Sequence, residues 1–434
     1  MKFKLFFSSI IIIFACIIFF TYNYIGKKKE KIVILENQII DLKIQRENLA
    51  DTIGYIPFKF NDNIKFDIFD NTLNLKKYKT NVLNFTKGFG GKGSSYLDYF
   101  DNRLYLITAN GLMARTNLSK LSSDNFKMDV IKTNLSEKLN HRIMYKQLAY
   151  GVKDILINDN IIYISFTDEI KKDCFNISLL EGSITGEKIN FKYFFKPKTC
   201  IQKDVESYFS LHQSGGRIIN YDDDNLLVSF GEFRSRLLAQ NTKTINGKIV
   251  KINKKTKNFE IISIGHRNPQ GLLFDEDTNH IFSSEHGPKG GDEINVIKDN
   301  KQIQNFGWPI ASYGEHYDKA GEDNTKLYKF APLYKSHKDH GFVEPKIKFT
   351  PSIGISELIM LKLFNEKILI ASSLGNNISE GDMSLHIYNL KETQLKNYKI
   401  VPINERIRDL IYIKSQNKII LFLESSASIG VINL

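Results

Sequence analysis

The chain has 434 residues, of which 42% are hydrophobic, so it is long enough to bury a large core. Its formal net charge is +12, but the lysines are spread over the whole sequence and form no basic stripe. This spread, without a recognisable nucleic-acid-binding module, argues against a nucleic-acid partner.

A long apolar run from Leu5 to Ile25 opens the chain. About 20 helical residues cross a bilayer core, and this run has that length. A cleaved signal peptide would be shorter and would end in small residues, and the bulky residues around Cys16 do not suit a lipoprotein site. We therefore predict a transmembrane signal anchor at residues 1–26, with the membrane as a partner.

The segment 27–54 contains an apolar seam whose members recur at alternating steps of three and four residues. They are Ile32, Leu35, Ile39, Leu42 and Leu49, with Arg46 interrupting the series. This spacing predicts a short coiled-coil stalk that could join copies of the chain into a homo-oligomer. A single amphipathic helix packed on the main domain would show the same pattern, and two to three heptads do not separate the two structures.

Residues 55–434 consist of short apolar runs separated by polar turns, such as residues 154–158 and 161–167 around Asp159 and Asn160. Such spacing, with 20 tyrosines and 31 phenylalanines in the chain, predicts an all-β domain. A sandwich rarely needs about 380 residues, whereas a propeller of about six four-stranded blades does. The glycine-rich segment 88–95 lacks the Walker spacing, so we predict a turn there that leads into a strand.

Cys174 and Cys200 flank a predicted hairpin in this domain. Two cysteines so placed could form a disulfide in an oxidising compartment. Whether they pair is left open by the sequence.

Three loop segments collect the polar residues of a possible site: 265–271 (Gly-His-Arg-Asn-Pro-Gln-Gly), 284–295 and 305–309. Glycine lets backbone approach a ligand, and carbonyl and carboxylate oxygens suit a hard cation such as calcium. Ordinary turns between blades collect the same residue types, so composition alone leaves both interpretations open.

These segments resemble the PQQ-dependent glucose and aldose sugar dehydrogenases, also called glucose/sorbosone dehydrogenases. The match at residues 265–271 is long and specific, and weaker similarity runs from about residue 88 to the C-terminus. The resemblance implies a six-bladed β-propeller with PQQ on its axis and calcium beside it. It also implies an oxidoreductase that converts an aldose sugar to a lactone.

The segment around His212 resembles the one that holds the family's general base, so His212 would accept the sugar hydroxyl proton. An unperturbed imidazole pKa near 6.5 would suit that role at neutral pH. Arg267 and Asn268 match residues that contact the quinone, and the guanidinium of Arg267 would stabilise charge on its oxygen. The neighbouring His266 is not expected to be the base.

The resemblance assigns two further sets of residues. Gly287 and Pro288 match positions that give backbone carbonyls to calcium, and Glu293 matches an acidic position linked to that ion. Arg406 and Arg408 lie two residues apart on a predicted strand, so they point to one face and could clamp the carboxylates of PQQ.

The chain also departs from the family pattern. It lacks the lysine that often pairs with PQQ near Gly375, and the usual Gln and Gly-Leu-Leu-Gly pattern is eroded around residues 149–152, with Gln147 out of register. Phe306 replaces a usual Tyr, and residues 231–232 are Gly-Glu where Gly-Asp is usual. These departures motivate a second hypothesis, a non-catalytic propeller module on a stalk that has lost PQQ binding.

Enzymes that this chain resembles work in the periplasm. We therefore expect a single-pass inner-membrane protein whose propeller lies in the periplasm, and a disulfide would fit that compartment. The four lysines within residues 27–31 oppose this orientation, because cationic segments beside a membrane span tend to stay cytoplasmic.

Overall fold

The computed structural model describes residues 21, 24–39, 41–42, 50–69, 71–83, 94–140, 143–144, 149–203, 209–298, 302–317 and 329–434. The chain divides into two compact units, Met1–Thr52 and Ile53–Leu434. Each unit is described by itself below.

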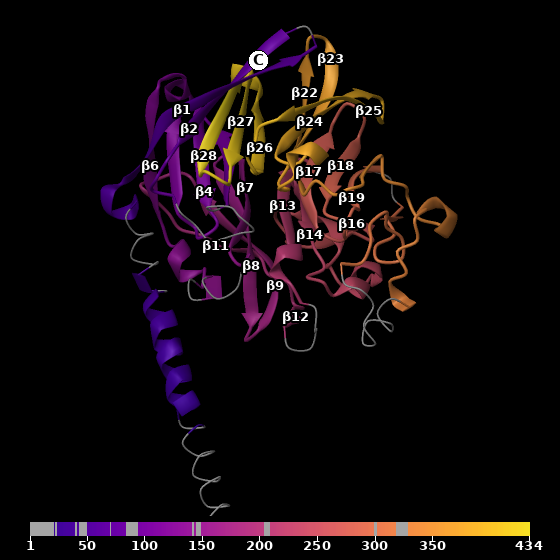
Figure 1. Cartoon of the computed structure of the whole chain (residues 1–434), viewed down its shortest axis with the longest axis horizontal. Coiled ribbons are helices and arrows are strands. Elements are labelled where there is room, and N and C mark those ends of the chain that lie inside the picture. Colours follow the sequence, from indigo (N-terminus) through magenta and orange to yellow (C-terminus); the bar gives the residue numbers. More distant parts are fainter. Residues whose placement is uncertain are drawn as a thin grey trace, which may run out of the picture. The chain divides into compact units, whose positions relative to one another are not determined.

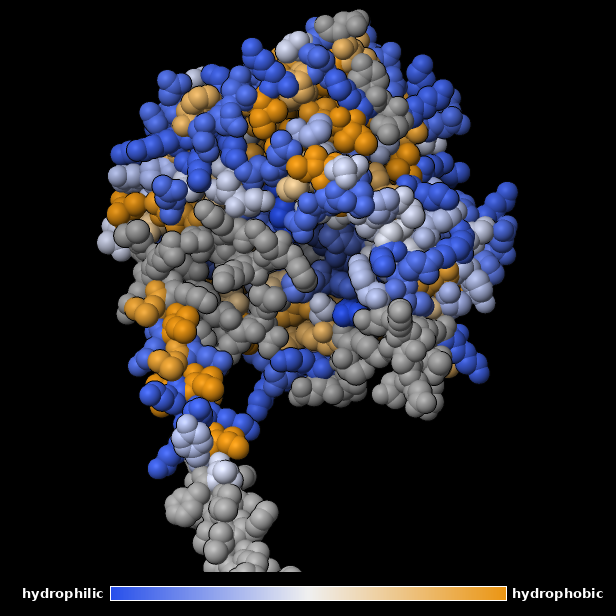
Figure 2. All heavy atoms as spheres, viewed as in Figure 1, coloured by the Kyte–Doolittle hydropathy of each residue, from blue (hydrophilic) through white to orange (hydrophobic). Residues whose placement is uncertain are grey.

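The first unit contains a helix at residues 24–39. Ile32, Leu35 and Ile39 of the predicted seam are exposed on it, and Figure 2 shows apolar side chains (orange) along the helix. In the described part of the chain, no helix is both long and apolar enough to cross a membrane. The predicted anchor at residues 1–26 lies mostly outside the described residues, as do Arg46 and Leu49 of the seam. The anchor and the coiled coil therefore stay predictions.

The regular structure of the second unit is mainly antiparallel sheet, as expected from the short apolar runs, so the predicted all-β class is confirmed. Within the described ranges, the strand pairing gives six groups of four strands. The groups are β3 (Ser95–Phe100), β4 (Arg103–Thr108), β5 (Met113–Asn117) and β6 (Asn125–Thr133); β7 (Val152–Asn158), β8 (Ile161–Lys171), β9 (Cys174–Ser183) and β11 (Lys192–Phe195); β13 (Gly215–Asn220), β14 (Asn225–Phe230), β15 (Lys248–Asn253) and β16 (Phe259–Ile264); β17 (Pro269–Asp275), β18 (His280–Glu285), β19 (Asp292–Lys298) and β21 (Ile347–Phe349); β22 (Ile355–Leu363), β23 (Glu366–Ser373), β24 (Ser384–Lys391) and β25 (Gln394–Pro402); and β26 (Ile407–Ile413), β27 (Lys418–Leu423), β28 (Ser428–Asn433) and β2 (Asn71–Lys79).

Shorter elements lie at the edges of these groups. They are the strands β10 (Lys188–Ile189), β12 (Ile201–Gln202) and β20 (Gln304–Asn305), and the 3-10 helices η1 (Leu118–Ser122), η2 (Leu135–Glu137), η3 (Leu211–Gln213), η4 (Arg236–Gln240), η5 (Lys338–His340), η6 (Ile378–Glu380) and η7 (Lys414–Gln416). Of the glycine-rich segment 88–95, only Ser94 and Ser95 are described, and Ser95 begins β3.

The last group joins the two ends of the second unit. β2 pairs with β28, placing Leu75 opposite Ile432, and Figure 1 shows the yellow C-terminal strands beside the indigo N-terminal ones. The long strand β1 (Tyr55–Ile68) pairs with both β2 and β6, so it links the last group to the first. The first strands of the groups contact one another in a closed cycle, β3–β7–β13–β17–β22–β26–β3. This is the arrangement of a β-propeller, with the first strands around its axis.

Carboxylates on the first strands form hydrogen bonds between neighbouring groups of strands. Asp98 on β3 accepts a hydrogen bond from a backbone N–H of β7 at 2.5 Å, and Asp154 on β7 accepts one from β13 at 2.7 Å. Asp409 on β26 closes the cycle by accepting from a backbone N–H of β3 at 2.5 Å. These bonds satisfy backbone donors that would otherwise be buried without a partner.

Buried serines on the second strands form a related repeat. The hydroxyls of Ser165 on β8, Ser229 on β14 and Ser284 on β18 each donate to a backbone carbonyl on the first strand of the next group. This repeat amounts to one serine in about 60 residues, which explains why no repeated motif is visible in the sequence.

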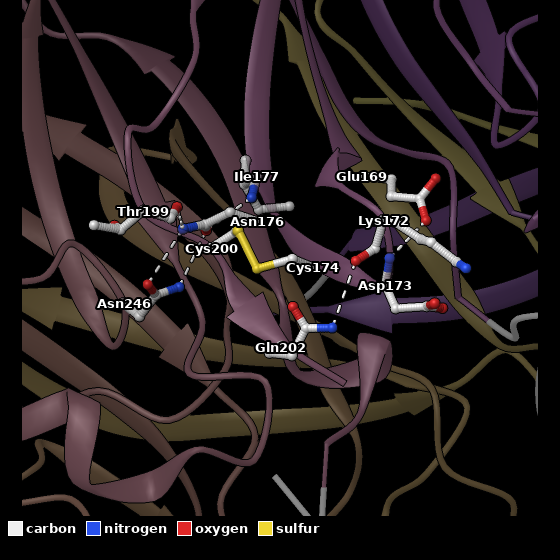
Figure 3. Close-up of a disulfide and its surroundings, with 10 residues drawn as sticks. All are labelled: Glu169, Lys172, Asp173, Cys174, Asn176, Ile177, Thr199, Cys200, Gln202 and Asn246. Atoms are coloured by element: carbon white, nitrogen blue, oxygen red, sulfur yellow. Dashed lines mark hydrogen bonds between the residues drawn. A yellow bond between two sulfur atoms is a disulfide. The ribbon is translucent and has the colours of Figure 1, made fainter. Parts of the chain in front are cut away.

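Cys174 and Cys200, whose pairing the sequence left open, form a disulfide. Cys174 begins β9, and Cys200 precedes β12, which pairs with the start of β9 (Figure 3). Beside the disulfide, the amide of Asn176 donates to the carbonyl of Thr199 at 2.9 Å. The bond therefore fastens a loop of the second group back onto its sheet.

Candidate functional site

A cavity of about 640 Å³ lies among the first strands and their connecting loops. A volume of this size is typical of pockets that hold a small-molecule ligand. Its lining is strongly basic: among the described residues that line it are six Lys or Arg side chains and one carboxylate, Asp292. The cations are Lys153, Arg217, Arg234, Arg267, Arg406 and Arg408. The cavity therefore suits an anionic ligand.

His212 lines this cavity, as the sequence predicts, and lies on η3. Ser210 caps η3, and its hydroxyl lies 3.4 Å from Nδ1 of His212. Burial, with the nearby charges of Lys153 and Arg408, lowers the pKa of His212 to about 4. The expected unperturbed pKa is therefore wrong, but the imidazole is neutral at pH 7, which is the form that can accept a proton.

Arg267 and Asn268 precede β17 and also line the cavity, as predicted. Arg267 donates from Nη1 to the carbonyl of His286 at 2.9 Å, and its guanidinium lies 5.3 Å from the centre of the Trp308 ring. Asn268 is buried, and its Oδ1 accepts a hydrogen bond from the backbone N–H of Gly215 at 3.0 Å. Both side chains are thus held in place from behind the cavity wall.

His266 has a structural role, in agreement with the sequence analysis. Its ring is fully buried, with Nε2 2.7 Å from the hydroxyl of Ser263 and Nδ1 3.2 Å from Glu285. Glu285 also accepts a hydrogen bond from the backbone N–H of Arg267 at 2.8 Å. His266 therefore fixes the loop that carries Arg267, without reaching the cavity.

Arg406 and Arg408 line the cavity together, but they share a partner that the sequence analysis missed. Glu424, which follows β27, is almost fully buried, lies 3.3 Å from Nε of Arg406 and forms an ion pair with Nε of Arg408 at 2.5 Å. The hydroxyl of Ser94 also donates to Glu424 at 2.9 Å. A carboxylate directly after the apolar run 419–423 was the sequence signal for it.

Arg217 joins four of the first strands beside the cavity. Its guanidinium lies 2.8 Å from Asp154, 2.6 Å from Glu357 and 2.7 Å from Asp409. Burial raises the pKa of Asp154 to about 7 and that of Glu357 to about 8, although the charge of Arg217 opposes both shifts. One cation thus holds three buried carboxylates, and breaking such a cluster is costly.

The three predicted calcium residues do not all line the large cavity. Gly287 lines the cavity, but the carbonyl of Pro288 already accepts hydrogen bonds from the N–H of Gly291 at 3.0 Å and the hydroxyl of Ser352 at 3.3 Å. Glu293 lines a second, smaller cavity, which Gly287 also lines; it lies 3.6 Å from Nε2 of His337, and burial raises its pKa. The described residues contain no group of three or more His, Cys, Asp or Glu side chains placed to hold a metal ion.

Gly375, in the segment where the resemblance leads us to expect a lysine, has no room for a side chain. A Cβ atom added to Gly375 would lie 2.0 Å from Cγ of Asp382, so the carboxylate of Asp382 occupies the space of a larger residue. A lysine does enter the cavity from another strand: Lys153 on β7 lines it and donates to the carbonyl of Ala149. The sequence analysis missed Lys153, because it treated the adjoining residues 149–152 only as an eroded pattern.

The fold and the cavity define a β-propeller with a basic ligand-binding cavity among its first strands. The family model for glucose/sorbosone dehydrogenases matches residues 127–429, and the chain belongs to this family. It is 35% identical over 116 residues to the aldose sugar dehydrogenase YliI of Escherichia coli K12, an alignment that covers 24% of this chain and 30% of that relative. The alignment with an uncharacterised Synechocystis protein likewise covers only 37% of that relative.

Solved structures show the same fold. The apo form of the soluble aldose sugar dehydrogenase from Escherichia coli superposes with a TM-score of 0.62 at 17% identity, covering 82% of this chain and 99% of that one. The PQQ-bound aldose sugar dehydrogenase from Streptomyces coelicolor gives a TM-score of 0.54 at 16% identity, covering 79% and 99%.

Proposed function

We propose that this chain is a PQQ-dependent oxidoreductase that oxidises aldose sugars to lactones. The observation that carries the proposal is the neutral imidazole of His212, which lines one cavity together with Arg267, Arg406 and Arg408. Three of the proteins named above, two from Escherichia coli and one from Streptomyces coelicolor, are described as aldose sugar dehydrogenases, and the last was solved with PQQ, which supports the same chemistry.

The cavity residues fit PQQ, a quinone with three carboxylates. Arg217 is paired with three buried carboxylates, but the other five cations against one carboxylate in the lining complement such an anion. Nε2 of His286, which also lines the cavity, is buried and forms no hydrogen bond with another described residue, so it is available to a ligand. Arg406 and Arg408 together outweigh the single charge of Glu424, so the cluster keeps a positive charge for a ligand carboxylate.

When bound, PQQ supplies a quinone that accepts the hydride from the sugar carbon. His212 accepts the proton of the hydroxyl on that carbon, so the sugar loses two electrons and two hydrogens and becomes the lactone. Arg267, fixed by the carbonyl of His286 and the face of Trp308, presents a positive charge that stabilises negative charge developing on the quinone oxygen. Asn268 holds the backbone of Gly215 and thereby the loop that follows His212.

Calcium, which the family resemblance implies, fits the described residues less well. The carbonyl of Pro288 already accepts hydrogen bonds, and Glu293 lines only the smaller of the two cavities that share Gly287, so we derive no step through the ion. Gly287 alone of the three lines the large cavity. Calcium remains a prediction, which equilibrium dialysis with and without PQQ would test.

The parts of the chain outside the site complete the proposal. The closed cycle of first strands supports a propeller of six blades within residues 55–434. Residues 1–26 would anchor the chain in the inner membrane and residues 27–54 would form an oligomeric stalk. The Cys174–Cys200 disulfide supports a periplasmic domain, because disulfides persist in that compartment. Protease protection in spheroplasts and sedimentation of the detergent-solubilised chain would test the orientation and the oligomer.

A second candidate is a propeller that binds a partner without catalysis. The observation in its favour is Asp382, whose carboxylate leaves no room for a side chain at Gly375, in the segment where the family often has a lysine. This candidate predicts a fold that is indifferent to PQQ and a variant His212→Ala without any phenotype.

One experiment separates the two candidates. The purified full-length chain is incubated with PQQ and calcium, and reduction of an electron-accepting dye is followed with a series of aldoses. The proposal predicts PQQ-dependent dye reduction, and a gain of about 2.7 kcal/mol in the free energy of unfolding when PQQ exceeds its Kd a hundredfold. No activity with any aldose, together with an unchanged melting temperature, would contradict it.

A further inference from the structure

Lys153 occupies a place in its strand that matches that of Arg408. The register between β7 and β8 shifts between Val152 and Asp154, so Lys153 is an extra residue without a partner on β8. The register between β26 and β27 shifts in the same way between Ile407 and Asp409, so Arg408 is the extra residue there. Such bulges re-aim a side chain, and both residues line the cavity.

The neighbouring strand is shaped to admit this lysine. A Cβ atom added to Gly216 on β13 would lie 2.5 Å from Cβ of Lys153, so only glycine leaves the space. Gly216 also has a φ of +115°, a conformation that other residues rarely adopt. The stem of Lys153 therefore passes β13 only because residue 216 lacks a side chain.

In the part of the chain that the structure describes, the ammonium group of Lys153 has a hydrogen bond but no ion pair with a carboxylate. It donates to the carbonyl of Ala149 and forms no ion pair with any other residue in the described ranges. Burial and the charge of Arg408 lower its pKa to about 7, while Glu424 acts in the opposite direction. A buried cation without a counter-ion is unfavourable, and an anionic ligand in the cavity would supply one.

We infer that Lys153 pairs with a carboxylate of bound PQQ and replaces the cation that the chain lacks near residue 375. This inference rests on the proposed function. The cation enters the cavity from β7, whereas Asp382 excludes it at Gly375.

The pairing predicts that PQQ binding takes up a proton. At pH 8, a group with a pKa of about 7 is mostly deprotonated, and a paired carboxylate raises that pKa, so binding takes up to about 0.9 proton at Lys153. Other charged or titratable groups lie on Lys153's own strand and on the elements around it, so the proton count needs a matched variant. They are Tyr96 and Asp98 on β3, Asp154 on β7, His212 on η3, Arg217 on β13, Arg408 on β26 and Glu424 after β27.

The test is calorimetric titration of the full-length chain with PQQ at pH 8, in buffers of different ionisation enthalpy. Three variants are compared with the unmodified chain: Lys153→Met, Lys153→Arg and, as a control of equal charge change, Lys362→Met on the exposed face of β22. We expect Lys153→Met to bind PQQ about 10- to 100-fold more weakly and to lose most of the proton uptake. Lys153→Arg should keep more of the affinity but lose the uptake, and Lys362→Met should change neither.

Each outcome has a separate meaning. If the unmodified chain binds PQQ and Lys153→Met binds it within twofold with the same proton uptake, the Lys153 inference is wrong and the PQQ site stands. If the unmodified chain does not bind PQQ at all, the proposed function fails, and the role of Lys153 fails with it. The melting temperature of each PQQ-free variant verifies folding, and Lys153→Gln replaces the methionine variant if that protein does not fold.

Discussion

The role of His212 is tested by replacing it with Asn, which removes the proton acceptor and keeps a polar side chain of similar size. Loss of a general base lowers the rate about 10²- to 10⁴-fold. In the PQQ-free chain the pKa of His212 is about 4, three units below pH 7, so about 99.9% of the imidazole is neutral there. The charges of Lys153 and Arg408 contribute to this shift, and the carboxylates of bound PQQ would oppose it. The acid limb of kcat/KM in the loaded enzyme should therefore lie between about pH 4 and 6.5.

Two measurements test this reasoning. Proton NMR titration of the PQQ-free chain, with the Asn variant as the assignment control, should place the His212 pKa near 4. Dye-linked kcat/KM is then measured from pH 4 to 9, and activity should fall as pH decreases, because the base becomes protonated. A His212→Asn enzyme that keeps more than a tenth of its activity would refute the assignment of His212 as the base. A His212 signal that titrates at 6.5 or above would contradict the lowered pKa.

Other substitutions probe the scaffold of the site through urea-induced unfolding. Arg217→Met should lower the free energy of unfolding by about 3–5 kcal/mol at pH 8, because three buried carboxylates lose their cation. Two of these carboxylates, Asp154 and Glu357, have folded pKa values of about 7 and about 8, above their unfolded values near 4. The folded state therefore binds more protons than the unfolded state, and stability falls as pH rises through that window. At pH 5 both carboxyls are protonated, so removing the cation should cost less than at pH 8. Replacing Cys174 and Cys200 by Ser should cost about 3.5 kcal/mol, since the disulfide spans 26 residues, and an unchanged denaturation midpoint would contradict this. Gly216→Ala should cost about 1–3 kcal/mol through its positive φ and its contact with Lys153, and a neutral effect would show that β13 can shift.

Much of the site could be predicted from the sequence because its residues lie in short, distinctive loop segments. His212, Arg267, Asn268, Arg406 and Arg408 come from three separate parts of the chain, and all of them line one cavity. The alternation of short apolar runs and polar turns likewise indicated an all-β domain. Each of these predictions depends on residues that are neighbours in the sequence, and none requires a contact between distant parts of the chain.

The missed features depend on contacts between distant parts of the chain. Glu424 pairs with Arg406 only because β26 and β27 are adjacent, and Lys153 enters the cavity only because a bulge displaces it and Gly216 makes room. The lowered pKa of His212 arises from burial and from charges on other strands. No sequence motif indicates these contacts, because the residues that make them are far apart in the chain.

A crystal structure of the chain soaked with PQQ and calcium tests the central claim most directly. We predict PQQ in the 640 Å³ cavity, with its carboxylates against Arg406, Arg408 and Lys153 and its quinone between Arg267 and His212. A cavity that stays empty at saturating PQQ, or PQQ bound elsewhere on the molecule, would contradict the account.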